Sequence, residues 1–156
     1  IEGRKQVGHW EGDTVGGKGH SGCIATFVER KSGYLLAVKL ERGTAKNFEK
    51  ASKRSFAAIP NKYRKTLTLD NGTEMSNYEE IERYTGLQIY FANPYHSWER
   101  GTNENTNGLL RFYFPKKMSF AHLTQEKLDV AVKQLNTRPR KRLGYKTPEQ
   151  MFRAKW

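Results

Sequence analysis

One stretch near the N-terminus decides the fold: His9-Trp10-Glu11-Gly12-Asp13-Thr14-Val15. Its alternation predicts a half-buried strand with His9, Glu11 and Asp13 on one face. Two β-rich runs follow it, at 23–28 and 34–40, and Lys31-Ser32-Gly33 between them is typical of a hairpin turn. These three segments predict the antiparallel part of a sheet.

The rest of the chain alternates helix and strand patterns. Helices are expected at 44–58, 76–84, from Thr102 to before Pro115, from Thr124 onward, and after the Thr147-Pro148-Glu149-Gln150 capping box; strands are expected at 66–69 and 87–91. This order implies an α/β fold in which helices pack on a five-stranded mixed sheet.

The net charge of the chain indicates which kind of partner it binds. The 156 residues suit one domain, and 28 Lys and Arg against 16 Asp and Glu give a net charge of +12. Residues 108–156 hold 12 basic and 3 acidic residues, which is +9 of that excess. The excess points to a polyanion, with DNA first and a membrane surface second. The alternative is that the positive charge has no binding partner and belongs to a solvent-exposed helical face with a basic tail.

Several classes of protein are excluded by the same counts. The single cysteine, Cys23, leaves no disulfide framework and no cysteine-based zinc site, and it is typical of a reducing compartment. No apolar run reaches the roughly 18 residues of a membrane span. Ile1-Glu2-Gly3-Arg4 matches a protease site used to remove purification tags, so we treat residues 1–6 as a linker or a cloning remnant.

Three acidic residues lie at positions in the predicted strands and helices that suit a metal-binding site. Asp13 lies in the first strand, Asp70 ends the fourth, and Glu104 lies in the first turn of a helix. Carboxylates bind Mg²⁺, and two ions about 3.5–4 Å apart activate the attacking oxygen and stabilise the leaving one in phosphodiester chemistry. Taken singly, each acid also fits a plain role as a surface charge, helix cap or turn residue.

The wider motifs resemble a known family. Gly8-His9-Trp10-Glu11-Gly12-Asp13-Thr14-Val15, Leu69-Asp70-Asn71-Gly72-Thr73-Glu74 and the block from Pro94 to Arg111 are similar to the catalytic blocks of bacterial insertion-sequence DDE transposases of the IS-thirty family. Fifty-six residues separate Asp13 from Asp70 and thirty-three separate Asp70 from Glu104, which also resembles that family. The segment 136–149 resembles the tail of these cores. The likeness covers about residues 7–153.

The resemblance implies a ribonuclease H-like fold of the retroviral integrase type, in a single catalytic core over residues 1–156. In that family a helix-turn-helix region precedes the core, and we expect this sequence not to contain it. Asp13, Asp70 and Glu104 would be the catalytic, metal-binding triad, holding two Mg²⁺ or Mn²⁺ ions with DNA bound. Glu99 is a rival for the third position, but helical phase favours Glu104 because Asn107 and Arg111 fall on its face. Glu11 is expected to support the site or to be solvated.

The activity implied is hydrolysis and strand transfer of transposon DNA ends into target DNA. Expected DNA contacts are Asn107, Arg111, Lys116, Lys117, Arg140, Lys141, Arg142 and the loop residue Trp98, for which packing onto the sheet is the alternative. The partners would be transposon ends, target DNA and further copies of the chain on DNA, without a membrane or a small-molecule substrate. The location expected is the bacterial cytoplasm, at the nucleoid.

Two alternatives remain open from the sequence. In a restriction-type endonuclease, Asp13 would act with the acid-x-Lys motif Glu29-Arg30-Lys31. In a non-catalytic DNA-binding module, the basic last third alone would act, and binding would not depend on Mg²⁺ or on Asp70.

Overall fold

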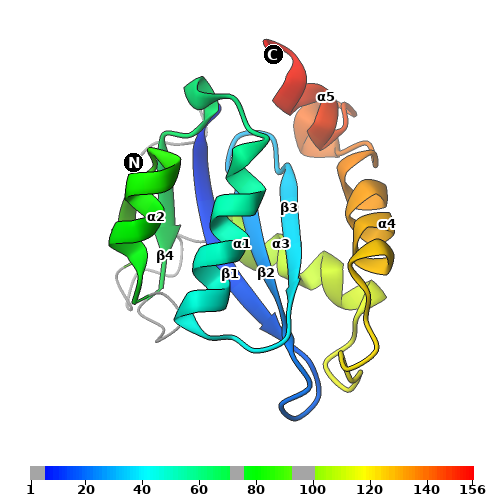
Figure 1. The fold of residues 1–156 in the computed structure, drawn as a ribbon. Coiled ribbons are helices and arrows are strands. Elements are labelled where there is room, and N and C mark those ends of the chain that lie inside the picture. The colour runs from blue at the N-terminus through cyan, green and yellow to red at the C-terminus, as the bar shows by residue number, and fades with distance from the viewer. Residues whose placement is uncertain (1–5, 71–75, 93–100) are drawn as a thin grey trace.

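The computed structural model describes residues 6–70, 76–92 and 101–156, and they form one mixed sheet flanked by helices (Figure 1). The strands are β1 His9–Gly16, β2 Cys23–Glu29, β3 Leu35–Leu40, β4 Thr66–Leu69 and β5 Gln88–Phe91. Their order across the sheet is β3-β2-β1-β4-β5. The β1–β2 and β2–β3 pairs are antiparallel, whereas β4 runs parallel to β1 and β5 parallel to β4. The expected five-stranded mixed sheet is confirmed.

Helices cover both faces of this sheet. They are α1 Ala45–Ala57, α2 Tyr78–Thr85, α3 Gly101–Tyr113, α4 Gln125–Asn136 and α5 Pro148–Arg153, with short 3₁₀ turns η1 Asn61–Tyr63 and η4 Lys141–Leu143. In Figure 1, α1 and α2 lie in front of the sheet, α3 crosses behind it, and α4 runs beside β3. No helix in the described ranges is both long and apolar enough to cross a bilayer.

Two hydrophobic clusters hold the layers together. Between the sheet and α1, Trp10, Phe27 and Phe56 are fully buried, and Phe152 of α5 reaches the same cluster with its ring centroid 5.5 Å from that of Trp10. Behind the sheet, a second cluster joins β1 and β2 to α3 and α4; its fully buried members include Ile24 and Leu110. The sheet is therefore buried on both faces, which fixes its strand register.

Local sequence signals account for most helix ends. Thr44, Thr124 and Thr147 each accept a hydrogen bond from the backbone N–H three residues ahead, and Thr147 forms the expected capping box. Gly86 closes α2 with a φ of 76°. The helix expected from Ser76 begins instead at Tyr78, with Asn77 as its N-cap.

The outer edge of β3 is covered by side-chain amides of α4. Asn136 accepts a hydrogen bond from Leu35 N–H and donates one to Leu35 O, both at 2.9 Å. Three turns earlier, Gln125 accepts from Lys39 N–H at 2.9 Å and donates to Ala37 O at 3.1 Å. Helix α4 thus takes the place of a sixth strand, and these backbone groups are satisfied.

Candidate active site

The alternation of β1 puts Glu11 and Asp13 on one face, as predicted, and the structure shows that α3 lies over this face. On one side of the strand, Trp10 enters the cluster beneath α1. On the other side, Glu11 Oε1 accepts a hydrogen bond from the Asn103 backbone N–H at 3.1 Å, and Asp13 Oδ2 accepts one from Asn107 Nδ2 at 3.1 Å. Two successive turns of α3 are therefore tied to two successive polar positions of β1.

A small amide network fixes the orientation of the Asp13 carboxylate. Asn107 Nδ2 also donates to Asn103 Oδ1 at 3.2 Å, and Thr26 of β2 donates to Asn107 Oδ1 at 3.3 Å. The second carboxylate oxygen, Asp13 Oδ1, accepts from the Thr14 N–H at 2.8 Å. Asp13 remains half-buried, so the residue is partly accessible to solvent.

Glu11 is built into the support of the site. It is fully buried, and its Oε2 lies 3.1 Å from Nε of Arg30. The expectation that Glu11 supports the site agrees with this contact, whereas a solvated Glu11 is wrong. Sequence reasoning missed Arg30, Thr26 and Asn103, whose only signal was their polar character among buried neighbours. Together they place the first turns of α3 against β1.

Asp70 follows β4 on the same face as Asp13. The parallel register pairs His9 with Thr66 and Glu11 with Thr68, and His9 Nδ1 lies 2.8 Å from Thr66 Oγ1 on that face. Continuing this register by two residues pairs Asp13 with Asp70. Asp70 is half-buried, like Asp13, so both carboxylates are reachable from solvent at the carboxyl end of parallel neighbours.

Glu104 is exposed in the first turn of α3. Arg111 shares its flank of the helix, being seven residues further on, and donates to Gly16 O at the end of β1 at 3.0 Å. Arg111 therefore places this flank beside the carboxyl end of β1. Within the described ranges, however, no group of three or more His, Cys, Asp or Glu side chains is arranged to hold a metal ion. Asp13 thus lies on the α3 side of β1, the continued register predicts the same side for Asp70, and Glu104 lies on a flank of α3.

The donor set at this face fits a hard divalent cation. Asp13, Asp70 and Glu104 offer carboxylate oxygens, which are the ligands that Mg²⁺ and Mn²⁺ prefer. Asp13 and Asp70 are half-buried and Glu104 is exposed, in contrast to the fully buried Glu11 and Glu29.

The acid of the restriction-type motif is used for structure. Glu29 is fully buried, and its carboxylate accepts hydrogen bonds from the backbone N–H groups of Gly8, Lys31 and Ser32. Burial raises the pKa of Glu29, and these hydrogen bonds counter that effect in part. Glu29 therefore organises the β2–β3 turn and is not presented to a metal or to DNA.

The expected DNA contacts lie in several places. Lys116 and Lys117 are exposed in the turn after α3. Arg111 is half-buried, and burial lowers its pKa. Asn107 is engaged with Asp13, as described above. Trp98, like the rival acid Glu99, lies outside the described residues.

The basic run near η4 is partly anchored to the backbone. Arg140 donates to Leu135 O at 2.8 Å, and Arg142 donates to Lys31 O at 3.1 Å. Lys141 is exposed between them. These bonds fix the positions of the two guanidinium groups.

A five-stranded mixed sheet of this order, covered by helices on both faces, defines the class of ribonuclease H-like folds. The chain belongs to the integrase core domain family, whose model matches residues 3–97. It is 46% identical over 152 residues to the transposase InsI for insertion sequence element IS30A of Escherichia coli (strain K12), and this match covers 97% of the chain and 39% of the relative. The transposase for insertion sequence element IS4351 of Bacteroides fragilis is 40% identical, with coverage of 98% and 47%.

Solved structures agree on the fold. The catalytic core domain of BIV integrase superposes with a TM-score of 0.72 at 20% identity, covering 96% of this chain and 95% of that one. A chain of the simian T-cell lymphotropic virus intasome in complex with PP2A regulatory subunit B56 gamma gives a TM-score of 0.72 at 20% identity, with coverage of 92% and 53%. The chain therefore has the retroviral integrase-type fold, and it spans less than half the length of the transposases it matches.

Proposed function

We propose that this chain is the catalytic domain of a DDE transposase, which hydrolyses transposon DNA ends and transfers them into target DNA. The observation that carries the proposal is the shared face and register of Asp13 and Asp70, with α3 and Glu104 across from them. The similarity to transposases supports the proposal. This similarity covers 39% and 47% of the length of the two relatives named above.

Asp13, Asp70 and Glu104 are the residues that would hold Mg²⁺ or Mn²⁺, with two ions in the DNA complex. Such ions activate the attacking oxygen and stabilise the leaving oxygen of a phosphodiester. Asp13 comes from β1 and Asp70 directly follows β4, whereas Glu104 comes from the first turn of α3. The exposed Glu104 side chain would complete the site from α3, which is held against β1 by the contacts of Asn103 and Asn107.

The supporting residues have separable roles in this scheme. Asn107 donates to Asp13 Oδ2 and so helps to orient the carboxylate. The buried Glu11–Arg30 pair holds the Asn103 backbone and hence the first turns of α3. Together they set the distance between β1 and the helix that carries Glu104.

The proposed reaction consists of two successive displacements at phosphorus. Water attacks the phosphorus at the transposon end, the bond from phosphorus to the 3′ oxygen breaks, and a 3′-hydroxyl is left. That hydroxyl then attacks a target phosphodiester, its proton is lost to solvent, and the 3′ oxygen of the target strand leaves.

DNA contacts would come from Asn107, Arg111, Lys116, Lys117 and the segment 140–142, with Trp98 stacking on an unpaired end base. Because transposition joins two ends, we propose that copies of the chain assemble on DNA. The reaction would take place in the bacterial cytoplasm, on DNA of the nucleoid.

Nicking of a supercoiled plasmid in Mg²⁺ or Mn²⁺ tests the proposal, with DNA binding measured in parallel. The unaltered chain is expected to nick only with metal, and Asp70→Asn is expected to abolish nicking while binding persists. Glu104→Gln should act like Asp70→Asn, and Glu99→Gln should not. If the chain binds DNA but never cuts it, even when joined to the N-terminal part of a relative, the non-catalytic binding module replaces the proposal.

A further inference from the structure

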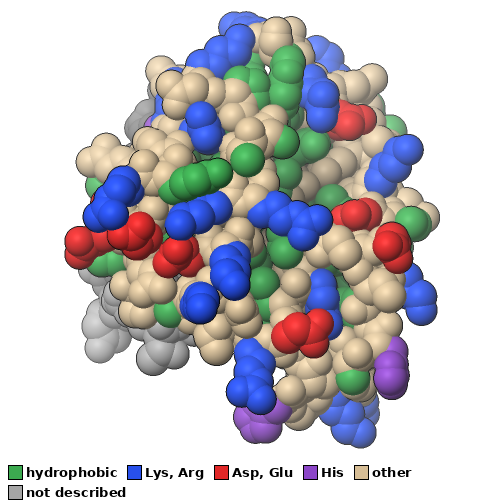
Figure 2. All heavy atoms as spheres, in the orientation of Figure 1, with side chains coloured by type: hydrophobic (Ala, Val, Ile, Leu, Met, Phe, Trp, Pro, Cys, Tyr) green, Lys and Arg blue, Asp and Glu red, His purple; other side chains and the backbone are tan. Residues whose placement is uncertain are grey.

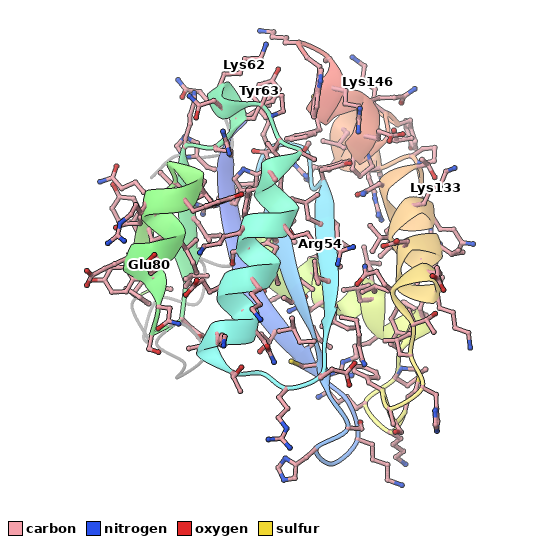
Figure 3. All side chains as sticks on the ribbon, viewed as in Figure 1. Arg54, Lys62, Tyr63, Glu80, Lys133 and Lys146 are labelled. Atoms are coloured by element: carbon pink, nitrogen blue, oxygen red, sulfur yellow. The ribbon has the colours of Figure 1, made fainter. Side chains whose placement is uncertain are left out.

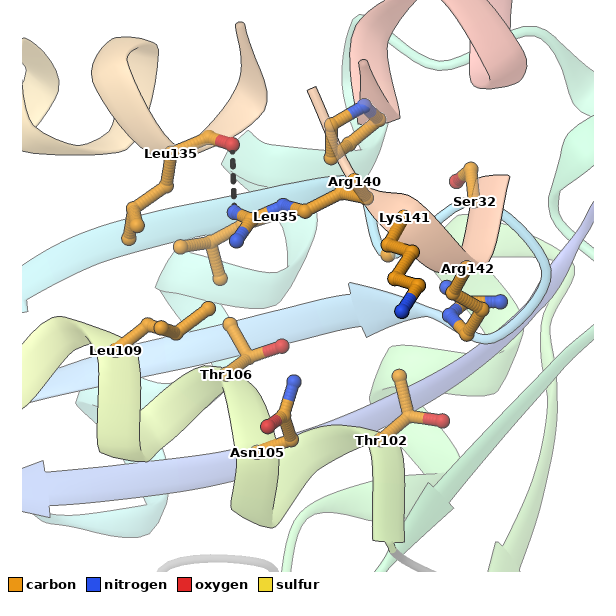
Figure 4. A pocket seen from close by; sticks show the side chains of 12 residues that line it. Ser32, Leu35, Thr102, Asn105, Thr106, Leu109, Leu135, Arg140, Lys141 and Arg142 are labelled. Carbon is orange, nitrogen blue, oxygen red and sulfur yellow. Dashed lines mark hydrogen bonds between the residues drawn. The ribbon is translucent and has the colours of Figure 1, made fainter. Parts of the chain in front are cut away.

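A second cavity lies on the opposite flank of α3 from Glu104. It encloses about 330 Å³ between α3, the β2–β3 turn, α4 and η4 (Figure 4). This volume is at the lower end of the about 300–1,000 Å³ typical of small-molecule sites. It equals roughly ten water volumes of about 30 Å³, which is more than a tetrahedral anion fills.

The mouth of the cavity is cationic. Arg140, Lys141 and Arg142 line it, and no Asp or Glu is among the described residues that do. The Arg140 guanidinium is fixed by the Leu135 carbonyl, and Figure 4 shows the Lys141 side chain extending from η4 toward α3. Burial and the charges of Arg138 and Arg142 lower the pKa of Arg140, which reflects a site short of negative charge. A phosphate would supply that charge.

The opposite walls are of two kinds. Leu35, Leu109 and Leu135 give an apolar floor, whereas Asn105 and Thr106 of α3 present an amide and a hydroxyl beside it. A flat, largely apolar ring with polar edges matches such walls, because its faces meet the leucines and its edge meets the amide.

We propose that this cavity takes one unpaired nucleotide of a DNA strand, with the base on the leucine floor and its phosphate at Arg140 and Lys141. The inference rests on the proposed function, because it supposes a DNA substrate. The cavity and the Asp13 side of α3 are separated by the helix, whose diameter with side chains is about 10–12 Å. The unpaired nucleotide would therefore lie outside the cleaved bond itself, a short stretch of strand away from it.

Fluorescence anisotropy without metal tests this inference separately from cleavage. The probes are a labelled 20-base-pair duplex with blunt ends, the same duplex with a three-thymidine tail, and one whose tail is abasic. We expect the thymidine tail to tighten binding about tenfold over the blunt end and the abasic tail to lose most of that gain.

Variants locate the effect. Asn105→Trp fills the mouth from an exposed position and should remove the preference for the tail while leaving blunt-end binding unchanged. Lys141→Ala should weaken binding of the tailed duplex, whereas Lys133→Ala, an exposed lysine on α4 outside the cavity, should not (Figure 3). Thermal unfolding of each variant checks that it is folded.

Each other outcome overturns the inference. Equal binding of thymidine and abasic tails would leave only a phosphate site, and equal binding of blunt and tailed duplexes would leave the cavity unused. Affinity for free thymidine monophosphate as high as for the tailed duplex would assign the cavity to a free nucleotide. Absence of binding to every DNA would contradict the proposed function as well, whereas the first three outcomes leave it standing.

Discussion

Two acidic residues that are two positions apart on β1 have different surroundings. Glu11 is fully buried against Arg30 and the Asn103 backbone, whereas Asp13 is half-buried with Asn107 beside it. Burial and pairing make Glu11 a structural group, and partial exposure makes Asp13 available to a ligand.

Neutralising each residue should separate these roles. Glu11→Gln leaves the charge of Arg30 without its buried partner, so we expect it to lower the free energy of unfolding by roughly 2–4 kcal/mol. Asp13→Asn should change that free energy by less than about 1 kcal/mol and should lower plasmid nicking at least about a hundredfold. Urea denaturation and nicking rates measure the two effects. A destabilising Asp13→Asn with normal nicking would reverse the assignment.

His9 adds a pH dependence to stability. Burial lowers the pKa of its imidazole, and the charges of Lys65 and Arg30 lower it further. The folded state therefore binds a proton less readily than the unfolded state, whose pKa is about 6.5. As the pH falls below about 6.5, the unfolded state takes up the proton first and stability is lost.

The thermal midpoint should accordingly fall between pH 7.5 and pH 5.5, and His9→Gln should show a smaller fall. The comparison of the two proteins removes the contributions of all other groups. An equal fall in both would show that His9 contributes nothing to the pH dependence.

At the scale of elements, α4 serves as the partner of the β3 edge. Its Asn136 and Gln125 satisfy backbone groups of Leu35, Ala37 and Lys39. Without them the outer edge of β3 would present unpaired donors and acceptors.

Asn136→Leu, which keeps the size but removes the amide, should lower the free energy of unfolding by roughly 2–4 kcal/mol because it leaves the N–H and C=O of Leu35 unsatisfied. Gln134→Ala on the exposed side of the same helix should stay within about 0.5 kcal/mol. Urea denaturation of both variants checks this. A small effect of Asn136→Leu would mean that water replaces the amide at the edge.

Local patterns predicted most elements, because their signals are carried by neighbouring residues. The alternation of β1, the threonine caps and the hairpin turn are of this kind, and all are present. The amide cap of Asn136 joins positions 101 residues apart, and the Glu11–Arg30 pair depends on how β1 and β2 align. No local pattern carries such contacts, so they could not be predicted.

Only part of the candidate site could be predicted from the sequence. Asp13 and Asp70 could be placed on one face, because each belongs to a strand and the parallel pairing follows from the fold. The relation of Glu104 to them depends on how α3 docks, which rests on the contacts of Asn103 and Asn107. Those contacts involve side chains whose partners are about ninety residues away.

The distribution of charge concerns the whole molecule. Figure 2 shows basic and acidic side chains interspersed over the face that carries α1 and α2. Residues 108–156 contain +9 of the net charge of +12. Association with DNA is therefore expected to use the α3 side and the C-terminal third, and it should weaken with salt.

The double variant Lys116→Ala, Lys117→Ala should lower the slope of log affinity against log salt by about two units, because each lysine contacting a phosphate contributes about 0.9. The matched double variant Lys46→Ala, Lys50→Ala, on α1 across the sheet, should leave the slope unchanged. Anisotropy titrations at several salt concentrations measure it. Equal decreases in both variants would indicate binding by overall charge without a defined surface.

The central claim is that Asp13, Asp70 and Glu104 converge on a divalent metal when DNA is bound. Paramagnetic broadening by Mn²⁺ in NMR spectra of the chain bound to a 20-base-pair duplex tests it most directly. We predict that the amide signals of Asp13, Asp70 and Glu104 broaden together at low Mn²⁺, that those of the half-buried Glu80 on α2 do not (Figure 3), and that Asp70→Asn removes the effect. Broadening at the two aspartates without α3, or equal broadening at Glu80, would contradict the claim.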